Sequence, residues 1–267
     1  MAPIVGVLII HGMGSQKPEF AEGMIEKLRD KLGDKADSVC FQPVYWAPVL
    51  SGREQKVWND LSAECDLDWV RLRKFVINAL GDATAYRYIP EESDCIYFQS
   101  HDIVHRELTA LRDKLGGDGK PLIVCAHSLG AVIMTDYIWD RQQGKDPGRY
   151  DQNPFVRMET LAGIVTFGCN IPLFTLAYDP VECITFPPET LPADLKAKAR
   201  WLNLFDPDDI LGWPLKALSP AFAKAVTEDR EINVGSVFTS WNPASHSEYW
   251  TDGNFIRPVV EVIGGFV

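Results

Sequence analysis

Three residue types that together can cleave acyl bonds occur along this chain in the order serine, carboxylate, histidine. Ser128 follows an apolar run at 122–126, Asp209 ends the acidic segment 206–209, and His246 lies nearer the C-terminus. A serine hydroxyl is a weak nucleophile until a histidine removes its proton, and the histidine needs a carboxylate to hold its tautomer. We therefore expect a catalytic triad of Ser128, Asp209 and His246.

Ser128 lies where the sequence pattern changes from strand to helix. The apolar run 122–126 is typical of a strand buried on both faces, and helical spacing begins at Leu129. A serine on such a turn has a cramped backbone that requires small residues two places before and after it, and Ala126 and Gly130 meet that requirement. The alternative is a buried turn whose serine only caps the helix.

Two backbone N–H groups are candidates for an oxyanion hole. Leu129 begins the helix after the serine, so its N–H points toward negative charge that develops beside Ser128. The second candidate is the N–H of Met13, in a glycine-containing turn at 11–15 that follows the apolar run 5–10. Parallel strands bind ligands at their C-terminal ends, where both turns would lie. An ordinary glycine turn is the alternative for 11–15.

The acid has three candidates, because Asp206, Asp208 and Asp209 stand together after the strand expected over 201–205. Carboxylates so close together repel one another, which favours a functional role for at least one of them. The alternative is a solvated turn, in which water screens the charges.

The rest of the chain predicts an α/β fold with a mostly parallel central sheet, helices on both faces and a helical insertion. We expect helices over 18–32, 94–115 and 253–263, and further strands over 39–46, 161–167 and 231–234. At this length, 1–267 is expected to form a single domain.

Residues 48–95 interrupt the alternation of strands and helices. We expect two helices, over about 53–63 and 67–80, with a turn near Gly81 and Asp82. The insertion either covers the active site as a lid or packs on the sheet edge, since Trp and Leu at helical spacing are core-formers first.

Two further patterns in the sequence could contribute to a site. The proline-rich segment 171–199 carries Leu173, Phe174 and Tyr178, which are candidates for the wall of an apolar substrate site or for loop packing. His101 and His105 are four residues apart and could ligate a metal, but no third ligand is in view, so surface histidines are expected. We expect no metal and no cofactor.

Composition excludes several classes of partner. The 267 residues include 26 basic and 37 acidic side chains, for a net charge of −11, which disfavours nucleic acid and anionic membranes. No segment approaches the roughly 20 apolar residues of a membrane span, and the N-terminus lacks the basic residues and cleavage site of a signal peptide. Six cysteines without a C-x-x-C pair favour free thiols in a reducing cytoplasm. Nothing in the sequence indicates an oligomeric state.

Four segments together resemble the α/β-hydrolase superfamily: 10–14, 126–130, 203–212 and 245–250. The chain is most similar to its intracellular lipase-like and esterase-like members, whose acid loop reads D-P-V-G or D-P-V-A and whose histidine loop reads H-S-x-Y-W. That alignment makes Asp209 the acid, with Asp208 and Asp206 as alternatives.

The resemblance implies a serine hydrolase that cleaves a small-molecule or lipid carboxylic ester through an acyl-serine, with Met13 and Leu129 as oxyanion donors. The chain departs from the family in three ways: Ala126 replaces a glycine, the antiparallel leader strands are missing, and 48–95 matches no known lid. An acyltransferase or thioesterase would use the same triad. A non-catalytic binding module on the same fold is the other alternative.

Overall fold

The computed structural model describes residues 3–14, 16–64, 68–145, 148–235, 246 and 248–267. Within these residues six strands form one sheet in the order β2-β1-β3-β4-β5-β6, and every neighbouring pair is parallel. The strands are β1 (Val5–Ile10), β2 (Val39–Val44), β3 (Leu122–His127), β4 (Leu161–Phe167), β5 (Arg200–Phe205) and β6 (Glu228–Glu231). The expected α/β class with a parallel sheet is confirmed.

Helices alternate with these strands along the chain. They are α1 (Glu22–Leu32), α2 (Pro48–Glu64), α3 (Val70–Ala85), α4 (Ile96–Leu115), α5 (Leu129–Gln142), α6 (Ile171–Thr175), α7 (Ala193–Lys196), α8 (Pro220–Ala225) and α9 (Gly253–Gly264), with 3-10 turns η1 (Gly33–Ser38) and η3 (Tyr249–Thr251). The proline-rich segment thus contains two short helices, α6 and α7, joined by irregular chain.

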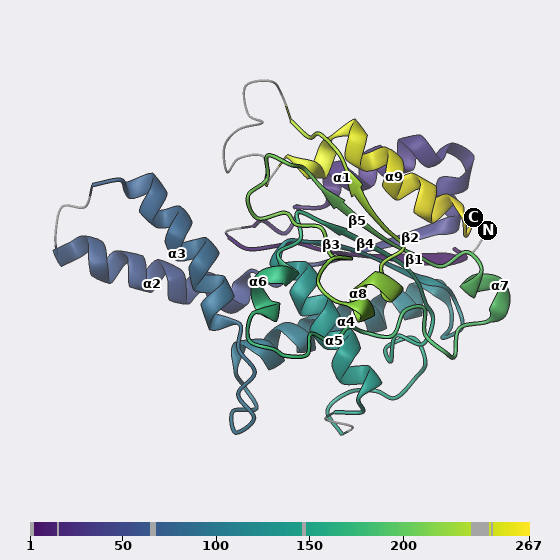
Figure 1. The fold of residues 1–267 in the computed structure, drawn as a ribbon, viewed down its shortest axis with the longest axis horizontal. Coiled ribbons are helices and arrows are strands. Elements are labelled where there is room, and N and C mark those ends of the chain that lie inside the picture. The colour runs from purple at the N-terminus through teal and green to yellow at the C-terminus, as the bar shows by residue number, and fades with distance from the viewer. Residues whose placement is uncertain (1–2, 15, 65–67, 146–147, 236–245, 247) are drawn as a thin grey trace.

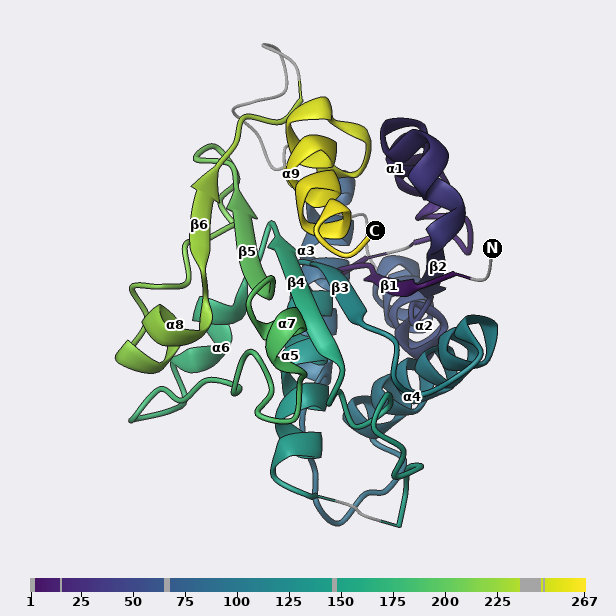
Figure 2. The same ribbon diagram turned by 90° about the vertical axis from the view of Figure 1, so that its right-hand side faces the viewer.

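Both faces of the sheet are covered, because alternate side chains of each strand point to opposite sides. On β1, Val5, Val7 and Ile9 pack in the core that α1 and α9 share. Leu8 and Ile10 pack in the core formed with α4 and α5. Figure 2 shows α1 and α9 together on one side of the sheet and α4 and α5 on the other. This two-sided burial explains why the strand sequences are almost continuously apolar.

Helices α2 and α3 project from the body as a hairpin (Figure 1). The two expected helices are therefore present, but the expected turn at Gly81 and Asp82 is wrong, because both residues lie inside α3. The Tyr86 N–H still donates to the Asp82 carbonyl at 2.9 Å, so the helix continues past the glycine. A single helical glycine costs only about 1 kcal/mol, which neighbouring turns offset. Residues 65–67, which include the first residue of the second predicted helix, lie outside the described chain.

The expectation that His101 and His105 are surface histidines is wrong. The His101 side chain is 1% exposed, and its Nε2 is hydrogen-bonded to the Tyr86 hydroxyl at 3.0 Å. His105 is half-buried, and its Nδ1 lies 3.5 Å from the Tyr137 hydroxyl. Their four-residue spacing places both on the side of α4 that faces α5, which makes them part of the packing.

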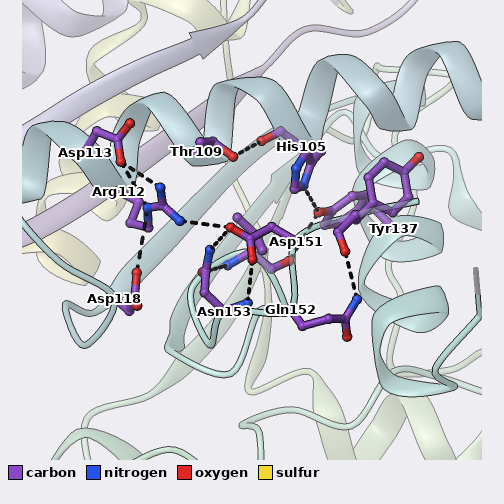
Figure 3. A network of polar contacts seen from close by, with 11 residues as sticks. His105, Thr109, Arg112, Asp113, Asp118, Tyr137, Asp151, Gln152 and Asn153 are labelled. Atoms are coloured by element: carbon purple, nitrogen blue, oxygen red, sulfur yellow. Dashed lines mark hydrogen bonds and ion pairs between the residues drawn. The ribbon is translucent and has the colours of Figure 1, made fainter. Parts of the chain in front are cut away.

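The C-terminal half of α4 is tied to the loop before β4 by a polar network (Figure 3). Arg112 Nη1 donates to Asp151 at 3.2 Å, and the same guanidinium reaches Asp113 at 2.9 Å. Asp151 also accepts from the Asn153 side chain at 2.9 Å. These contacts fix the loop that leads into β4, and they lie on α4 and its loop, apart from the candidate triad.

The last strand differs from its expected position, 231–234. β6 pairs with β5 from Leu202 opposite Glu228 to Phe205 opposite Glu231. Its sequence, Glu-Asp-Arg-Glu, is charged because an edge strand faces water, so it carries no apolar pattern.

Cys40, Cys95, Cys125, Cys169 and Cys183 are free, and Cys65 lies outside the described residues. No helix in the described part of the chain has the length and apolar character needed to cross a membrane.

Candidate active site

Ser128 occupies a strained turn between β3 and α5. Its φ and ψ are 51° and −126°, a conformation that side chains other than glycine rarely adopt and that costs on the order of 1–3 kcal/mol. The turn is held by the Ser128 N–H, which donates to the Phe167 carbonyl at 3.1 Å. The side chain makes no capping bond to α5, so the helix-cap interpretation is wrong. The hydroxyl instead faces His246.

Small residues around the turn allow two backbone segments to meet. A Cβ on Gly12 would lie 2.5 Å from the Ser128 Cβ, and a Cβ on Gly130 would overlap the His11 carbonyl oxygen. Ala126 is fully buried in β3 and fits with its one methyl group. The requirement for small neighbours therefore has a specific cause: the loop after β1, residues 11–14, packs directly against the serine turn.

His246 connects the serine to the acid. Its Nε2 lies 2.8 Å from Ser128 Oγ, and its Nδ1 lies 2.9 Å from Asp209 Oδ2. These distances make Nδ1–H the donor to the carboxylate and leave Nε2 free to accept the serine proton. The flanking Ser245 and Ser247 of the histidine motif lie outside the described residues.

Asp209 is the aspartate that reaches the histidine. Its carboxylate also accepts from the Leu211 N–H at 3.0 Å and from the Tyr249 hydroxyl at 2.9 Å. Burial alone would raise the pKa of Asp209, but hydrogen bonding and charge from His246, with these two donors, lower it below its usual value. Asp209 is therefore ionised at neutral pH. A Cβ on Gly212 would lie 2.7 Å from its Oδ2, so glycine is needed beside it.

The other two aspartates have different positions. Asp206 is fully buried and accepts from the Asp208 N–H at 2.8 Å and the Val234 N–H at 2.7 Å, so it shapes the acid loop. Asp208 is exposed to solvent. Tyr249 joins the arrangement, because its hydroxyl accepts from the Asp206 N–H at 3.0 Å while donating to Asp209. Two of the three neighbouring carboxylates thus have different roles. Asp209 contacts His246, and Asp206 shapes the acid loop.

His127, next to the serine, was not predicted as part of the site. Its Nε2 donates to the His246 carbonyl at 2.8 Å, and the two rings lie 4.7 Å apart. Burial, reinforced by the neighbouring His246, lowers the pKa of His127 well below its usual value, so the ring is neutral. This bond anchors the backbone of His246. Its position beside Ser128 was the available signal in the sequence.

His11 positions the loop that carries Met13. Its Nδ1–H donates to the Gly12 carbonyl at 2.8 Å, and its Nε2 accepts from the Trp46 N–H at 3.1 Å. Burial lowers its pKa to about 4, which keeps the imidazole neutral and fixes this tautomer. Because the Gly12 carbonyl and the Met13 N–H belong to one planar peptide, His11 sets the direction of that N–H.

Leu129 is the first residue of α5, so its N–H is one of the groups that helical hydrogen bonds leave unpaired. Within the described chain neither this N–H nor that of Met13 has a protein acceptor. Both lie on segments packed around Ser128, one directly after it and one against its Cβ through Gly12. The arrangement can donate two hydrogen bonds to an anion beside the serine.

Comparisons with known proteins add no assignment. A scan against protein families found no family model that matches the chain, and a search of curated proteins found no match. The chemistry of the site therefore has to be inferred from the geometry of its residues.

Proposed function

We propose that this protein is a serine hydrolase of the α/β-hydrolase type that cleaves carboxylic esters through an acyl-serine intermediate. The observation that carries this proposal is the continuous hydrogen-bonded chain from Ser128 Oγ to His246 Nε2 at 2.8 Å and from His246 Nδ1 to Asp209 at 2.9 Å. The backbone of Ser128 supports it as well, because Ser128 is strained and its side chain makes no capping bond to α5. Strain at a non-glycine residue is typical of a functional site.

In the proposed acylation, Ser128 Oγ attacks the ester carbonyl carbon while its proton moves to His246 Nε2. The carbonyl oxygen becomes an oxyanion that accepts from the Met13 and Leu129 N–H groups. The C–O bond to the alcohol then breaks, and the proton on Nε2 passes to the leaving oxygen. What remains is an acyl group esterified to Ser128 and a neutral imidazole.

Deacylation repeats these steps with water as the nucleophile. His246 takes a proton from water as its oxygen attacks the acyl carbon, and the second tetrahedral intermediate collapses to release the carboxylic acid. The proton on Nε2 returns to Ser128 Oγ. In both halves Asp209 holds the Nδ1–H and stabilises the imidazolium, which its lowered pKa permits.

An apolar acyl or alcohol group is the proposed substrate feature. Leu176 and Tyr178 are exposed in the segment that follows β4, and Ile210 is exposed in the acid loop after β5. Both segments leave the C-terminal edge of the sheet, where Ser128 also lies. Exposed apolar side chains on segments that leave this edge favour an apolar ligand over a charged one. The net charge of −11 and the free thiols support a cytoplasmic protein that does not bind nucleic acid.

Covalent labelling with a fluorophosphonate, read by intact-protein mass spectrometry and peptide mapping, tests the proposal. Wild-type protein should gain one adduct on Ser128, and Ser128→Ala should gain none. Ser100→Ala is the matched control, because Ser100 is also fully buried but lies on α4, and it should label like wild type. Folded wild-type protein that stays unlabelled would favour a non-catalytic binding module. Product analysis with added alcohol or thiol then separates hydrolysis from acyl transfer.

A further inference from the structure

The loop that carries Met13 is held from both sides. His11 fixes the peptide before Met13, through the Gly12 carbonyl. The peptide after Met13 is held by Asp82, whose Oδ2 accepts from the Gly14 N–H at 2.7 Å. Asp82 lies on α3, 68 residues away in sequence. The hairpin that projects from the body is thereby bonded to the candidate oxyanion loop.

Gly14 is suited to this contact by its backbone. Its φ of +87° lies in the left-handed region, where a side chain would add strain. The left-handed turn directs its N–H toward α3. Two neighbouring peptides therefore hold Met13, one through a core histidine and one through the hairpin.

Asp82 forms an acid pair with Glu54 of α2. The Asp82 side chain is almost fully buried, and its Oδ1 and the Glu54 Oε1 both lack a hydrogen-bond donor among the described residues. The two carboxyls act on each other electrostatically, and one proton kept on the pair would provide a donor for these unpaired oxygens. Since Asp82 also accepts from Gly14, the proton belongs mainly to Glu54. The shared proton provides the donor that the two buried oxygens otherwise lack.

The charges around the pair favour this protonation. Burial, followed by hydrogen bonding and repulsion from Asp82, raises the pKa of Glu54 to about 8, and burial raises that of Asp82 as well. Among the described residues no lysine, arginine or histidine contributes to either shift. His11, on the same loop, is neutral. At neutral pH the pair therefore carries one negative charge rather than two.

We propose that Asp82 is a positioning residue of the oxyanion loop, and that its acid pair with Glu54 couples docking of the α2–α3 hairpin to the alignment of the Met13 N–H. This inference rests on the proposed ester hydrolysis. When Glu54 loses its proton, two carboxylates repel each other inside the hairpin, and Asp82 is drawn from Gly14. Docking is thus complete at lower pH and is lost as pH rises through about 8.

Steady-state kinetics on a chromogenic ester separate this role from simple folding. Asp82→Ala removes the acceptor and should lower kcat about 10- to 100-fold with KM within about threefold, because the oxyanion donor acts in the transition state. Asp82→Asn keeps an oxygen for Gly14 and an N–H for Glu54, so kcat should stay within about threefold. Asp60→Ala, an exposed acid on the same hairpin paired with Lys56, is the control and should match wild type.

The pH profile provides the second readout. Wild-type kcat should fall above pH about 8, whereas Glu54→Gln, whose amide donates to Asp82 at every pH, should keep its kcat there. If Asp82→Asn loses as much kcat as Asp82→Ala, or if Glu54→Gln declines as the wild type does, the proposal is overturned.

Amide hydrogen exchange of Gly14, measured by NMR as a protection factor, tests the contact without any activity. Protection should be present in wild type at pH 7, lost in Asp82→Ala and retained in Asp82→Asn. An unprotected Gly14 in the wild type would overturn the contact. Gly14 exchange could follow the expected pattern while the protein shows no Ser128-dependent ester turnover. In that case the proposed function is wrong, and the Asp82–Gly14 contact has no role in catalysis.

Discussion

His246 and His101 each lie beside an aspartate and a hydroxyl group, but their surroundings differ. His246 Nδ1 is 2.9 Å from Asp209, whereas His101 Nδ1 is 3.8 Å from Asp140, beyond hydrogen-bond distance. Asp140 instead accepts from the Tyr97 hydroxyl at 2.7 Å, and Lys145 Nζ lies 3.0 Å from its other oxygen. Asp140 therefore interacts with Tyr97 and Lys145 and does not orient His101.

The hydroxyl groups differ as well. Ser128 has an aliphatic hydroxyl at the N-terminus of α5, beside two backbone N–H groups that have no acceptor among the described residues. Tyr86 has a phenol in a closed core, and burial, with the charge of Asp136 next, raises its pKa well above the usual value. We therefore propose Ser128 rather than Tyr86 as the nucleophile, because only Ser128 lies on a strained turn at a helix N-terminus.

Replacing each histidine with alanine gives the largest expected contrast. His246→Ala should lower kcat by about 10⁵-fold or more, because no base remains for Ser128. His101→Ala should leave kcat of the folded protein within about threefold but lower the free energy of unfolding by about 2–4 kcal/mol, since it opens a cavity and removes the bond to Tyr86. Ester kinetics and urea unfolding measure the two effects. Equal kinetic losses would remove the distinction between the regions.

Replacing the aspartates sharpens the assignment of the acid. Asp209→Asn should lower kcat by about 10⁴-fold, because an amide would favour the wrong tautomer of His246. Asp208→Asn is the adjacent control and should change kcat less than about twofold, as Asp208 is exposed. Full kcat/KM measurements on both variants check this, and a large loss in Asp208→Asn would contradict the position of Asp209.

Gly12→Ala tests the close packing between the loop after β1 and the serine turn. The new methyl group would lie 2.5 Å from the Ser128 Cβ, so the oxyanion loop must move, and kcat should fall about 10²- to 10³-fold. Gly52→Ala, where a Cβ meets open space on α2, should leave kcat unchanged. Active Gly12→Ala protein would show that the loop does not need its present position.

The smallest effect concerns acid stability. The pKa values of His11, His101 and His127 are all lowered, in each case first by burial, so unfolding lets them gain protons as pH falls below about 6.5. Stability should decrease over that range by up to about 1.4 kcal/mol per pH unit for each ring. Between pH 7.5 and 5.5, His101→Gln should lose about 1.4 kcal/mol less than wild type in urea unfolding. An identical loss would show that His101 is already protonated in the fold.

Sequence patterns predicted the sheet where strands are buried and failed where they are exposed. β3 and β4 have long apolar runs, so their positions were clear, whereas the charged edge strand β6 has none and was placed three residues too late. The turn predicted at Gly81 is absent for a related reason. The low helix propensity of glycine has less effect there than the helical hydrogen bonds that continue through α3.

By itself the sequence determined the α/β class and the strand-to-helix position of Ser128, because both follow from short-range apolar periodicity and from the small side chains at 126 and 130. Only the tertiary structure decided that Asp209 rather than Asp206 or Asp208 contacts His246, and that His11, His127 and Asp82 hold the surrounding backbone. Such contacts join residues up to 119 positions apart, and a shift of one residue in a loop redirects a side chain by several ångströms. No local pattern carries that information.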